Sequence, residues 1–247
     1  ISINKVIFSV RYMPDPMTPA QKKEYFALLC DIGFKEIEIG FPSASADDFQ
    51  FCRDLIEQDM IPEDVTISVL TQAREHLIKR TFEALKGVKQ AICHVYIATS
   101  DLHMHNVFKK NEDETQQTAV EAVRLIKQQA EAAEGSEIRL EFSPEEFTDT
   151  DLDFAVRICD AVVETWDPQG DEKVILNLPA TVERRMPNEY ADMIEEFCRR
   201  QKHRDQSIIS VHAHNDMGMA VAATQMTLMA GADRVEGTLF GHGERSG

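Results

Sequence analysis

The sequence predicts an α/β fold of the TIM, or (β/α)8, barrel type, and three observations support this fold class. Eight short runs rich in valine and isoleucine alternate with stretches of helical periodicity, a pattern typical of parallel βα units. The length of 247 residues is that of one such barrel. An open doubly wound sheet is the alternative, but the G-x-G-x-x-G turn that usually follows its first strand is absent from the sequence.

The elements follow in order along the chain. Thr18 is a predicted helix N-cap, with Pro19 at the first helical position and Gln21 completing a capping box, and this helix is expected to end at Gly33. Ser45 can cap the second helix. Other helices are expected to end at Gly87, Gly135 and Gly231. The predicted strands are Lys5 to Val10, Glu36 to Ile39, Val65 to Leu70, Ala91 to Tyr96, Ile138 to Phe142, Val174 to Leu178, Ile208 to His212 and Arg234 to Gly237.

Seven helices fit between these eight strands, and the sequence ends before an eighth helix. No linker or low-complexity segment divides the chain, so residues 1–247 are expected to form one barrel domain. In such barrels the active site lies at the C-terminal ends of the strands, so candidate residues are expected there.

The charge balance limits the partners. The 43 acidic residues outnumber the 26 basic ones, and the formal net charge is −17. Such a surface repels phosphate backbones and anionic lipids, so we expect neither a nucleic acid nor a membrane as partner. No apolar run reaches the roughly 18 residues of a spanning helix. An anionic substrate would need local positive charge from a metal ion or from clustered arginines.

The cysteines indicate a reducing environment. They are odd in number, widely spaced and without a C-x-x-C pair, which predicts small core residues and a cytoplasmic location. They are Cys30, Cys52, Cys93, Cys159 and Cys198.

The strongest candidate site is the run from Val211 to Asp216 at the end of the seventh predicted strand, which reads V-H-A-H-N-D. Side chains two residues apart on a strand point to the same face, so His212 and His214 can bind one metal ion. Two histidines and one carboxylate leave coordination positions open for the oxygens of a substrate. The alternative is a pair of ordinary histidines, which the position at a strand end disfavours.

A second H-x-H, from His103 to His105, provides an internal control. It lies several polar residues after the fourth predicted strand, where no strand is expected to align the two rings. We therefore expect a loop there that binds no metal, although either histidine can line the mouth of the site.

Glu38 is a candidate inside the barrel. It alternates with Ile37 and Ile39, which are expected to face the helices and so turn Glu38 inward. A buried carboxylate must be paired or bind a metal, because its desolvation is otherwise too costly. A structural ion pair is therefore the alternative to a catalytic role.

Three further strand ends carry candidates. Glu145 lies just past the fifth predicted strand, as an active-site acid or an exposed loop residue, and Thr181 follows the sixth. The segment from Gly241 to Gly247 follows the eighth strand. Its glycines permit the close backbone approach that anion-binding loops require, with Arg245 as a local cation, or they form a flexible end.

Together these motifs resemble the 2-isopropylmalate synthase family. The likeness runs from the first strand to the last residue, and the H-x-H-N-D run alone is shared with the wider metal-dependent DRE-TIM superfamily, which includes homocitrate and citramalate synthases and hydroxymethylglutaryl-CoA lyase. The turn from Phe41 to Ser45 and the Pro-Ala-Thr loop ending at Thr181 are more specific to the isopropylmalate branch. The other matching motifs are Glu38 to Gly40, Ser143 to Glu145 and Gly241 to Gly247.

The resemblance implies an acyltransferase that condenses acetyl-CoA with 2-oxoisovalerate to give 2-isopropylmalate and CoA, the first committed step of leucine biosynthesis. It implies a divalent metal cofactor (Mg, Mn or Zn), a homodimer, and residues 1–247 as the catalytic barrel without the family's C-terminal regulatory region. A sibling synthase or lyase acting on another 2-oxo acid, and a non-catalytic metal-binding barrel, stay open as alternatives. The implied residues are His212 and His214 for the metal, Glu38 to orient a strand-one arginine, Glu145 for acid or base work, His94, Tyr96, Ser143 and Thr181 around the 2-oxo acid, and Gly243, Glu244 and Arg245 for the acyl-CoA or the loop.

The first strand departs from the family pattern. Relatives continue it into an aspartate-leucine-arginine-aspartate-glycine-asparagine-glutamine stretch that supplies the catalytic arginine and the metal's carboxylate. Here Val10 passes directly to Arg11, so about seven residues are missing, and Arg11 and Asp15 lie past the junction. Either the natural chain carries this stretch as a loop at the junction, or a true deletion leaves the two histidines without their carboxylate.

Overall fold

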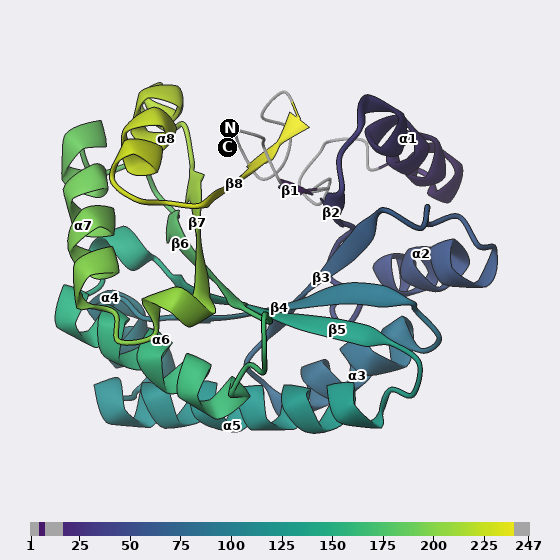
Figure 1. Ribbon diagram of the computed structural model, residues 1–247, viewed down its shortest axis with the longest axis horizontal. Helices are drawn as coiled ribbons and strands as arrows, with labels where there is room; N and C mark the ends of the chain where they lie inside the picture. The colour runs from purple at the N-terminus through teal and green to yellow at the C-terminus, as the bar shows by residue number, and fades with distance from the viewer. Residues whose placement is uncertain (1–4, 8–16, 240–247) are drawn as a thin grey trace.

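The computed structural model describes residues 5–7 and 17–239, and these form the predicted parallel barrel (Figure 1). The strands pair in sequence order, and β1 closes the barrel by pairing with both β2 and β8. The eight strands are β1 Lys5–Ile7, β2 Glu36–Glu38, β3 Thr66–Gln72, β4 Gln90–Ala98, β5 Glu137–Glu145, β6 Val174–Ala180, β7 Ser207–Ala213 and β8 Arg234–Thr238.

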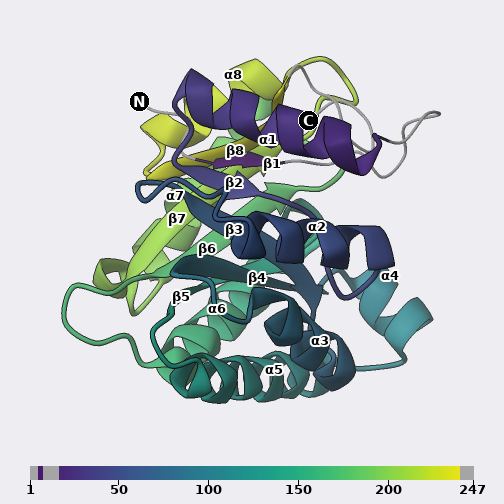
Figure 2. The same ribbon diagram turned by 90° about the vertical axis from the view of Figure 1, so that its right-hand side faces the viewer.

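Seven helices connect successive strands and lie around the outside of the barrel (Figures 1 and 2). They are α1 Pro19–Ile32, α2 Ala46–Glu57, α3 Glu75–Leu85, α5 Glu112–Ala132, α6 Leu152–Trp166, α7 Pro187–Arg200 and α8 Ala220–Met229. Short turns add α4 Asp101–His103, η1 Met104–Phe108, η2 Phe147–Asp149 and η3 Arg204–Gln206. None of the helices in the described ranges is both long and apolar enough to cross a membrane.

The predicted caps of the first two helices are confirmed. Thr18 and Gln21 form the capping box of α1, and Gly33 ends the helix in the left-handed region at φ 107°. Ser45 caps α2 by accepting a hydrogen bond from the backbone N–H of Asp48. Local side-chain chemistry therefore fixes where these two helices begin.

Several strands extend further than the sequence predicts. The sixth strand was expected to end at Leu178, yet β6 stays paired with β7 as far as Ala180. In the same way β4 and β5 stay paired as far as Ala98 and Glu145. Glu145 is thus the last residue of β5 and not a loop residue, because pairing with β4 holds the backbone extended past the apolar run.

Alternation along the strands separates a polar interior from an apolar outer core. Ile37 and Val95 are fully buried and belong to the apolar core, as the pattern predicted for the isoleucines beside Glu38. Their neighbours Glu38 and His94 are also buried, on the other face of the sheet. Barrel interiors are usually filled by valine, isoleucine and leucine, so charged side chains in this one require partners.

The predicted core cysteines are only partly confirmed. Cys52, Cys93 and Cys159 are buried, whereas Cys30 and Cys198 are half-buried. Residues 8–10 of the first predicted strand lie outside the described residues, as do Arg11 and Asp15.

Candidate metal and substrate site

His212 of β7 and His214, which directly follows the last residue of that strand, lie together, as the alternation of the predicted strand suggests. The rings of His212 and His214 stack with their centroids 4.5 Å apart and an interplanar angle of 27°. The Nδ1 atom of His214 lies 3.0 Å from the carbonyl oxygen of Ala180, the last residue of β6. A backbone contact of this kind orients a metal-binding imidazole and fixes its tautomer.

His212 has the properties of a metal ligand. Its Nε2 atom is inaccessible to solvent and has no hydrogen-bond partner among the described residues. Burial, reinforced by His214, lowers the pKa of His212 to about 3, although the charges of Glu236 and Glu38 act in the opposite direction. The ring is therefore neutral at physiological pH, which is the form that binds metal. An orphaned, neutral imidazole nitrogen fits a divalent metal ion.

Asn215 and Asp216, which follow His214, fix the loop after β7. Asn215 accepts a hydrogen bond from the backbone N–H of Ala220 at the start of α8, and Asp216 accepts one from the N–H of Glu183 at 2.8 Å. Glu183 in turn accepts from the backbone N–H groups of Met217 and Met219. Glu183 is buried and escaped the sequence analysis, because its partners lie more than thirty residues away.

The second H-x-H behaves differently, and the prediction of a loop there is wrong. His103 ends the short helix α4 and His105 lies in the following turn η1. The Nδ1 atom of His103 lies 2.6 Å from a carboxylate oxygen of Glu146, and Nδ1 of His105 lies 3.1 Å from the carbonyl oxygen of Asp101. Each ring is thus engaged with a different group.

A polar chain crosses the barrel interior from β2 to β6. His94 Nδ1 lies 2.8 Å from Glu38, His94 Nε2 lies 2.7 Å from the Ser143 hydroxyl, and Asn177 donates to that hydroxyl at 3.0 Å. Although burial raises it, the pKa of Glu38 is held at about 2 by Lys5 and His94. An ionised carboxylate only accepts hydrogen bonds, so the Nδ1 atom of His94 carries a proton.

Glu38 is therefore buried and paired, as predicted. Lys5 is its cation, with the ammonium nitrogen 2.7 Å from the carboxylate. The ion pair that we considered as the alternative is present, and it lies within the chain that links Glu38 to His94 and Ser143.

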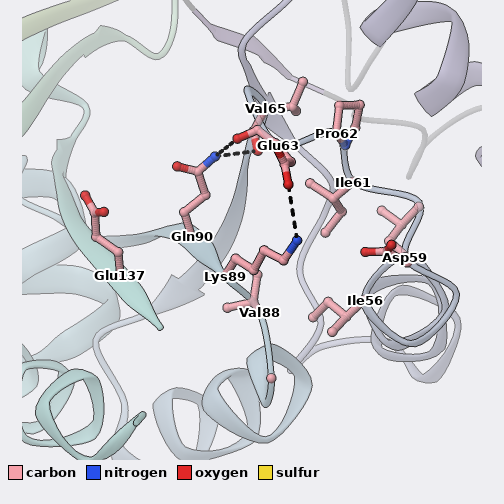
Figure 3. A pocket seen from close by; sticks show the side chains of 12 residues that line it. Ile56, Asp59, Ile61, Pro62, Glu63, Val65, Val88, Lys89, Gln90 and Glu137 are labelled. Carbon is pink, nitrogen blue, oxygen red and sulfur yellow. Dashed lines mark hydrogen bonds and ion pairs between the residues drawn. The ribbon is translucent and has the colours of Figure 1, made fainter. Parts of the chain in front are cut away.

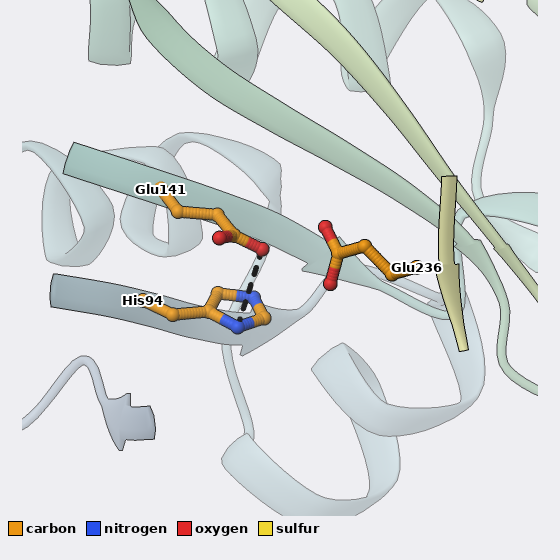
Figure 4. Close-up of side chains that lie close together, drawn as sticks. All are labelled: His94, Glu141 and Glu236. Carbon is orange, nitrogen blue, oxygen red and sulfur yellow. Dashed lines mark ion pairs between the residues drawn. The ribbon is translucent and has the colours of Figure 1, made fainter. Parts of the chain in front are cut away.

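His94 also belongs to a second group of buried residues, whose other members, Glu141 and Glu236, the sequence did not indicate. His94, Glu141 and Glu236 offer ligand atoms within 4.8 Å of one another (Figure 4). Burial and the negative charge of Glu236 raise the pKa of Glu141 to about 7, whereas Lys5 and Arg234 hold that of Glu236 far below its usual value despite its burial. Among the described residues, this is the one group of three or more histidines, cysteines and acids with metal-like spacing.

A cavity of about 630 Å³ opens at the C-terminal ends of β3, β4 and β5. Tyr96 and Glu145 line it, and the hydroxyl of Tyr96 accepts a hydrogen bond from Gln72 at 2.8 Å. The hydroxyl of Thr181 accepts a hydrogen bond at 2.9 Å from the backbone N–H of Glu146, the residue that follows Glu145. These candidates lie at the end of the barrel where (β/α)8 enzymes place their chemistry.

Another cavity, of about 390 Å³, lies at the opposite end of the strands (Figure 3). There Gln90 donates to the backbone carbonyls of Glu63 and Val65, and Lys89 faces the carboxylate of Glu63 at 4.0 Å. These contacts tie the starts of β3 and β4 together and involve none of the candidate residues. Gly243, Glu244 and Arg245 lie outside the described residues, so their predicted contacts stay predictions.

The chain is similar to known proteins over most of its length. A family model described as HMGL-like matches residues 11–247. The 2-isopropylmalate synthase of Clostridium acetobutylicum is 54% identical over 237 residues, which cover 95% of this chain and 42% of that protein. That of Rhodospirillum rubrum is 54% identical over 234 residues, covering 94% of this chain and 42% of its own. The chain thus spans about two fifths of the length of these curated relatives.

The solved structures give the fold. An HMG-CoA lyase of Bacillus subtilis superposes with a TM-score of 0.71 at 18% identity, covering 98% of this chain and 78% of that chain. At this identity the likeness concerns the barrel alone.

Proposed function

The chain belongs to the HMGL-like family, and from this membership we propose that it is the catalytic barrel of a 2-isopropylmalate synthase. The proposed reaction joins the methyl carbon of acetyl-CoA to the keto carbon of 2-oxoisovalerate. A methyl proton leaves to a base, the keto oxygen gains a proton, and water hydrolyses the thioester to release CoA. The observation that carries the proposal is the 54% identity to the Clostridium acetobutylicum synthase over 95% of this chain.

The proposed metal ligands are His212 and His214. The orphaned Nε2 atom of His212 and the oriented ring of His214 support this assignment. When bound, a divalent ion would act as a Lewis acid on the carbonyl of the 2-oxo acid. The third protein ligand expected from the family is the strand-one carboxylate, so the proposal includes the missing stretch in the natural chain.

The proposed 2-oxo acid site lies on the polar chain that ends at Ser143. Glu38 lies 2.8 Å from Nδ1 of His94, Nε2 of the same ring lies 2.7 Å from the Ser143 hydroxyl, and Ser143 accepts from Asn177. This directional chain holds the hydroxyl in one orientation, ready to contact a carboxylate or keto oxygen. The Oδ1 atom of Asn177 has no partner among the described residues, so it is available to a ligand in this site. Tyr96 and Thr181 are proposed to complete the walls of the same site.

Glu145 is proposed to act in proton transfer. Its backbone carbonyl accepts hydrogen bonds from both the N–H and the hydroxyl of Thr99, which fix the end of β5. Its side chain lines the cavity that Tyr96 also lines. A carboxylate at a fixed strand end beside a cavity has the position that a general acid or base requires.

The test is thiol release from acetyl-CoA by the natural full-length protein, measured with Mg²⁺, Mn²⁺ or Zn²⁺ and a panel of 2-oxo acids. We expect the highest kcat/KM with 2-oxoisovalerate. A preference for pyruvate or 2-oxoglutarate would assign a sibling condensation. Peptide mass mapping across the junction of Val10 and Arg11 accompanies the assay. Absence of both the extra stretch and thiol release would leave a non-catalytic metal-binding barrel.

The assembly and location stay predictions from the resemblance. Light scattering of the full-length protein tests the expected homodimer, and a monomeric mass would contradict it. Fractionation of the source cells tests the cytoplasmic location in the same way.

A further inference from the structure

Lys5 lies at the centre of the buried acidic cluster. Its side chain is fully buried, and its ammonium nitrogen lies 2.7 Å from Glu38, 2.9 Å from Glu141 and 3.1 Å from Glu236. Three carboxylates from β2, β5 and β8 thus surround one nitrogen that carries three hydrogens. The same nitrogen lies 3.2 Å from Nδ1 of His94.

The three side chains with metal-like spacing are all neighbours of this ammonium. His94, Glu141 and Glu236 were identified by the closeness of their ligand atoms, and Lys5 contacts each of them. Spacing alone therefore indicates a cation site, and the structure shows that the cation is a lysine. Nδ1 of His94 carries a proton because it faces the ionised Glu38. The 3.2 Å contact between this Nδ1 and the Lys5 ammonium therefore joins two donors and is not a hydrogen bond.

The interior charges show why this position needs a cation. Glu36, Glu38, Glu141 and Glu236 face inward, and Arg234 is their other buried cation, with contacts to Glu36, Glu141 and Glu236. Among the described residues Arg234 forms no ion pair with Glu38, whose cation there is Lys5. Loss of Lys5 would remove this cation from Glu38, and an unpaired buried charge is strongly destabilising.

We propose that Lys5 is a positioning residue that takes the place of a metal ion inside the barrel. Its ammonium binds three carboxylates, fixes the ionised Glu38, and through Glu38 and His94 orients the Ser143 hydroxyl. The role in orienting Ser143 for a 2-oxo acid rests on the proposed function, whereas the role as an internal cation does not. It follows that emptying the lysine site creates a divalent cation site separate from His212 and His214.

A matched pair of variants tests this role. Lys5→Ala leaves room for an ion, and Lys5→Met fills the space without a charge. In chelator we expect both to unfold about 10 °C below the wild type, because each leaves buried carboxylates uncompensated. Added Mn²⁺ should restore at least half of the loss in Lys5→Ala only, which should bind one more Mn²⁺ per chain than the wild type. Lys22→Ala is the control, since it removes a buried lysine that pairs with Asp48 outside the cluster.

These readouts need no catalysis, so they separate this inference from the proposed function. Equal Mn²⁺ binding by the wild type and Lys5→Ala, or equal rescue of Lys5→Met, would overturn it. If Lys5→Ala does not fold, the double variant Lys5→Met with Glu141→Gln removes one charge of each sign and should fold, and failure of the double variant would overturn the charge role.

The positioning role has its own kinetic signature. In Mn²⁺-rescued Lys5→Ala we expect the KM for the 2-oxo acid to rise about tenfold while the KM for acetyl-CoA is unchanged, as for loss of an orienting partner. Equal changes in both KM values would contradict the link through His94 and Ser143.

Discussion

The chain carries the H-x-H pattern twice, and the two copies have different structures. At the end of β7, the rings of His212 and His214 stack with their centroids 4.5 Å apart. Between β4 and α5 the backbone is helical, and His103 and His105 contact Glu146 and Asp101 separately. Successive helical residues are rotated by about 100°, so residues two apart point to different sides. The same three-residue pattern therefore makes a candidate ligand pair only where the backbone is extended.

The surroundings of the two copies differ as much as their backbones. His212 has a buried ring nitrogen without a partner in the part of the chain that the structure describes, whereas His103 is engaged by a carboxylate and is about one-third exposed. Two histidines can bind one metal ion when their rings face the same side and a ring nitrogen has no other partner. Of the two copies, the one at the end of β7 meets both conditions.

The largest expected effect comes from His212→Gln or His214→Gln. We expect each to lower kcat/KM for thiol release about 10³-fold, because loss of a metal that polarises a carbonyl costs several kcal/mol of transition-state stabilisation. Metal content measured after gel filtration should fall with activity. His105→Gln is the matched control, since this exposed ring contacts one backbone carbonyl, and it should leave both quantities unchanged. Loss of metal in His105→Gln would show that the second H-x-H takes part.

The comparison also shows what the sequence can predict. Alternation and caps are local, and they predicted the barrel, the N-caps Thr18 and Ser45, the closeness of His212 and His214, and the inward position of Glu38. The helical turn at His103 was not predicted, because polar residues between elements carry no periodicity.

The missed residues act over long separations in the chain. Lys5 contacts Glu141, which is 136 residues away, and Glu183 contacts backbone groups of the loop after β7. One lysine at the start of a short strand gives no local signal of three carboxylate partners. Its signal is collective, since inward positions of several predicted strands carry acids that need a cation.

A smaller effect is expected from Glu183→Ala, which releases the loop after the β7 copy. Glu183 is buried and accepts hydrogen bonds from two backbone N–H groups. Because bonds to a charged acceptor contribute about 1.5–3 kcal/mol each and water can replace part of them, we expect the free energy of unfolding to fall by about 2 kcal/mol. Denaturant titration measures this, with the exposed Glu75→Ala as a control that should leave the free energy of unfolding nearly unchanged. Metal affinity should fall about tenfold. An unchanged affinity would show that this loop does not position His212 and His214.

The smallest effect is expected at the contact that engages the second copy. Glu146 has a left-handed backbone at φ 63°, and its carboxylate contacts both His103 and Ser100. Because the His103 ring is partly exposed, we expect His103→Gln and Glu146→Gln each to lower the free energy of unfolding by about 0.5–1 kcal/mol. The double variant should lose no more than the larger single change, since both remove the same contact. Metal content should equal that of the wild type in all three, because the proposed metal ligands are His212 and His214 and not His103. Additive losses would mean that the two side chains act separately, and loss of metal would show that an H-x-H can contribute to a metal site without an extended backbone.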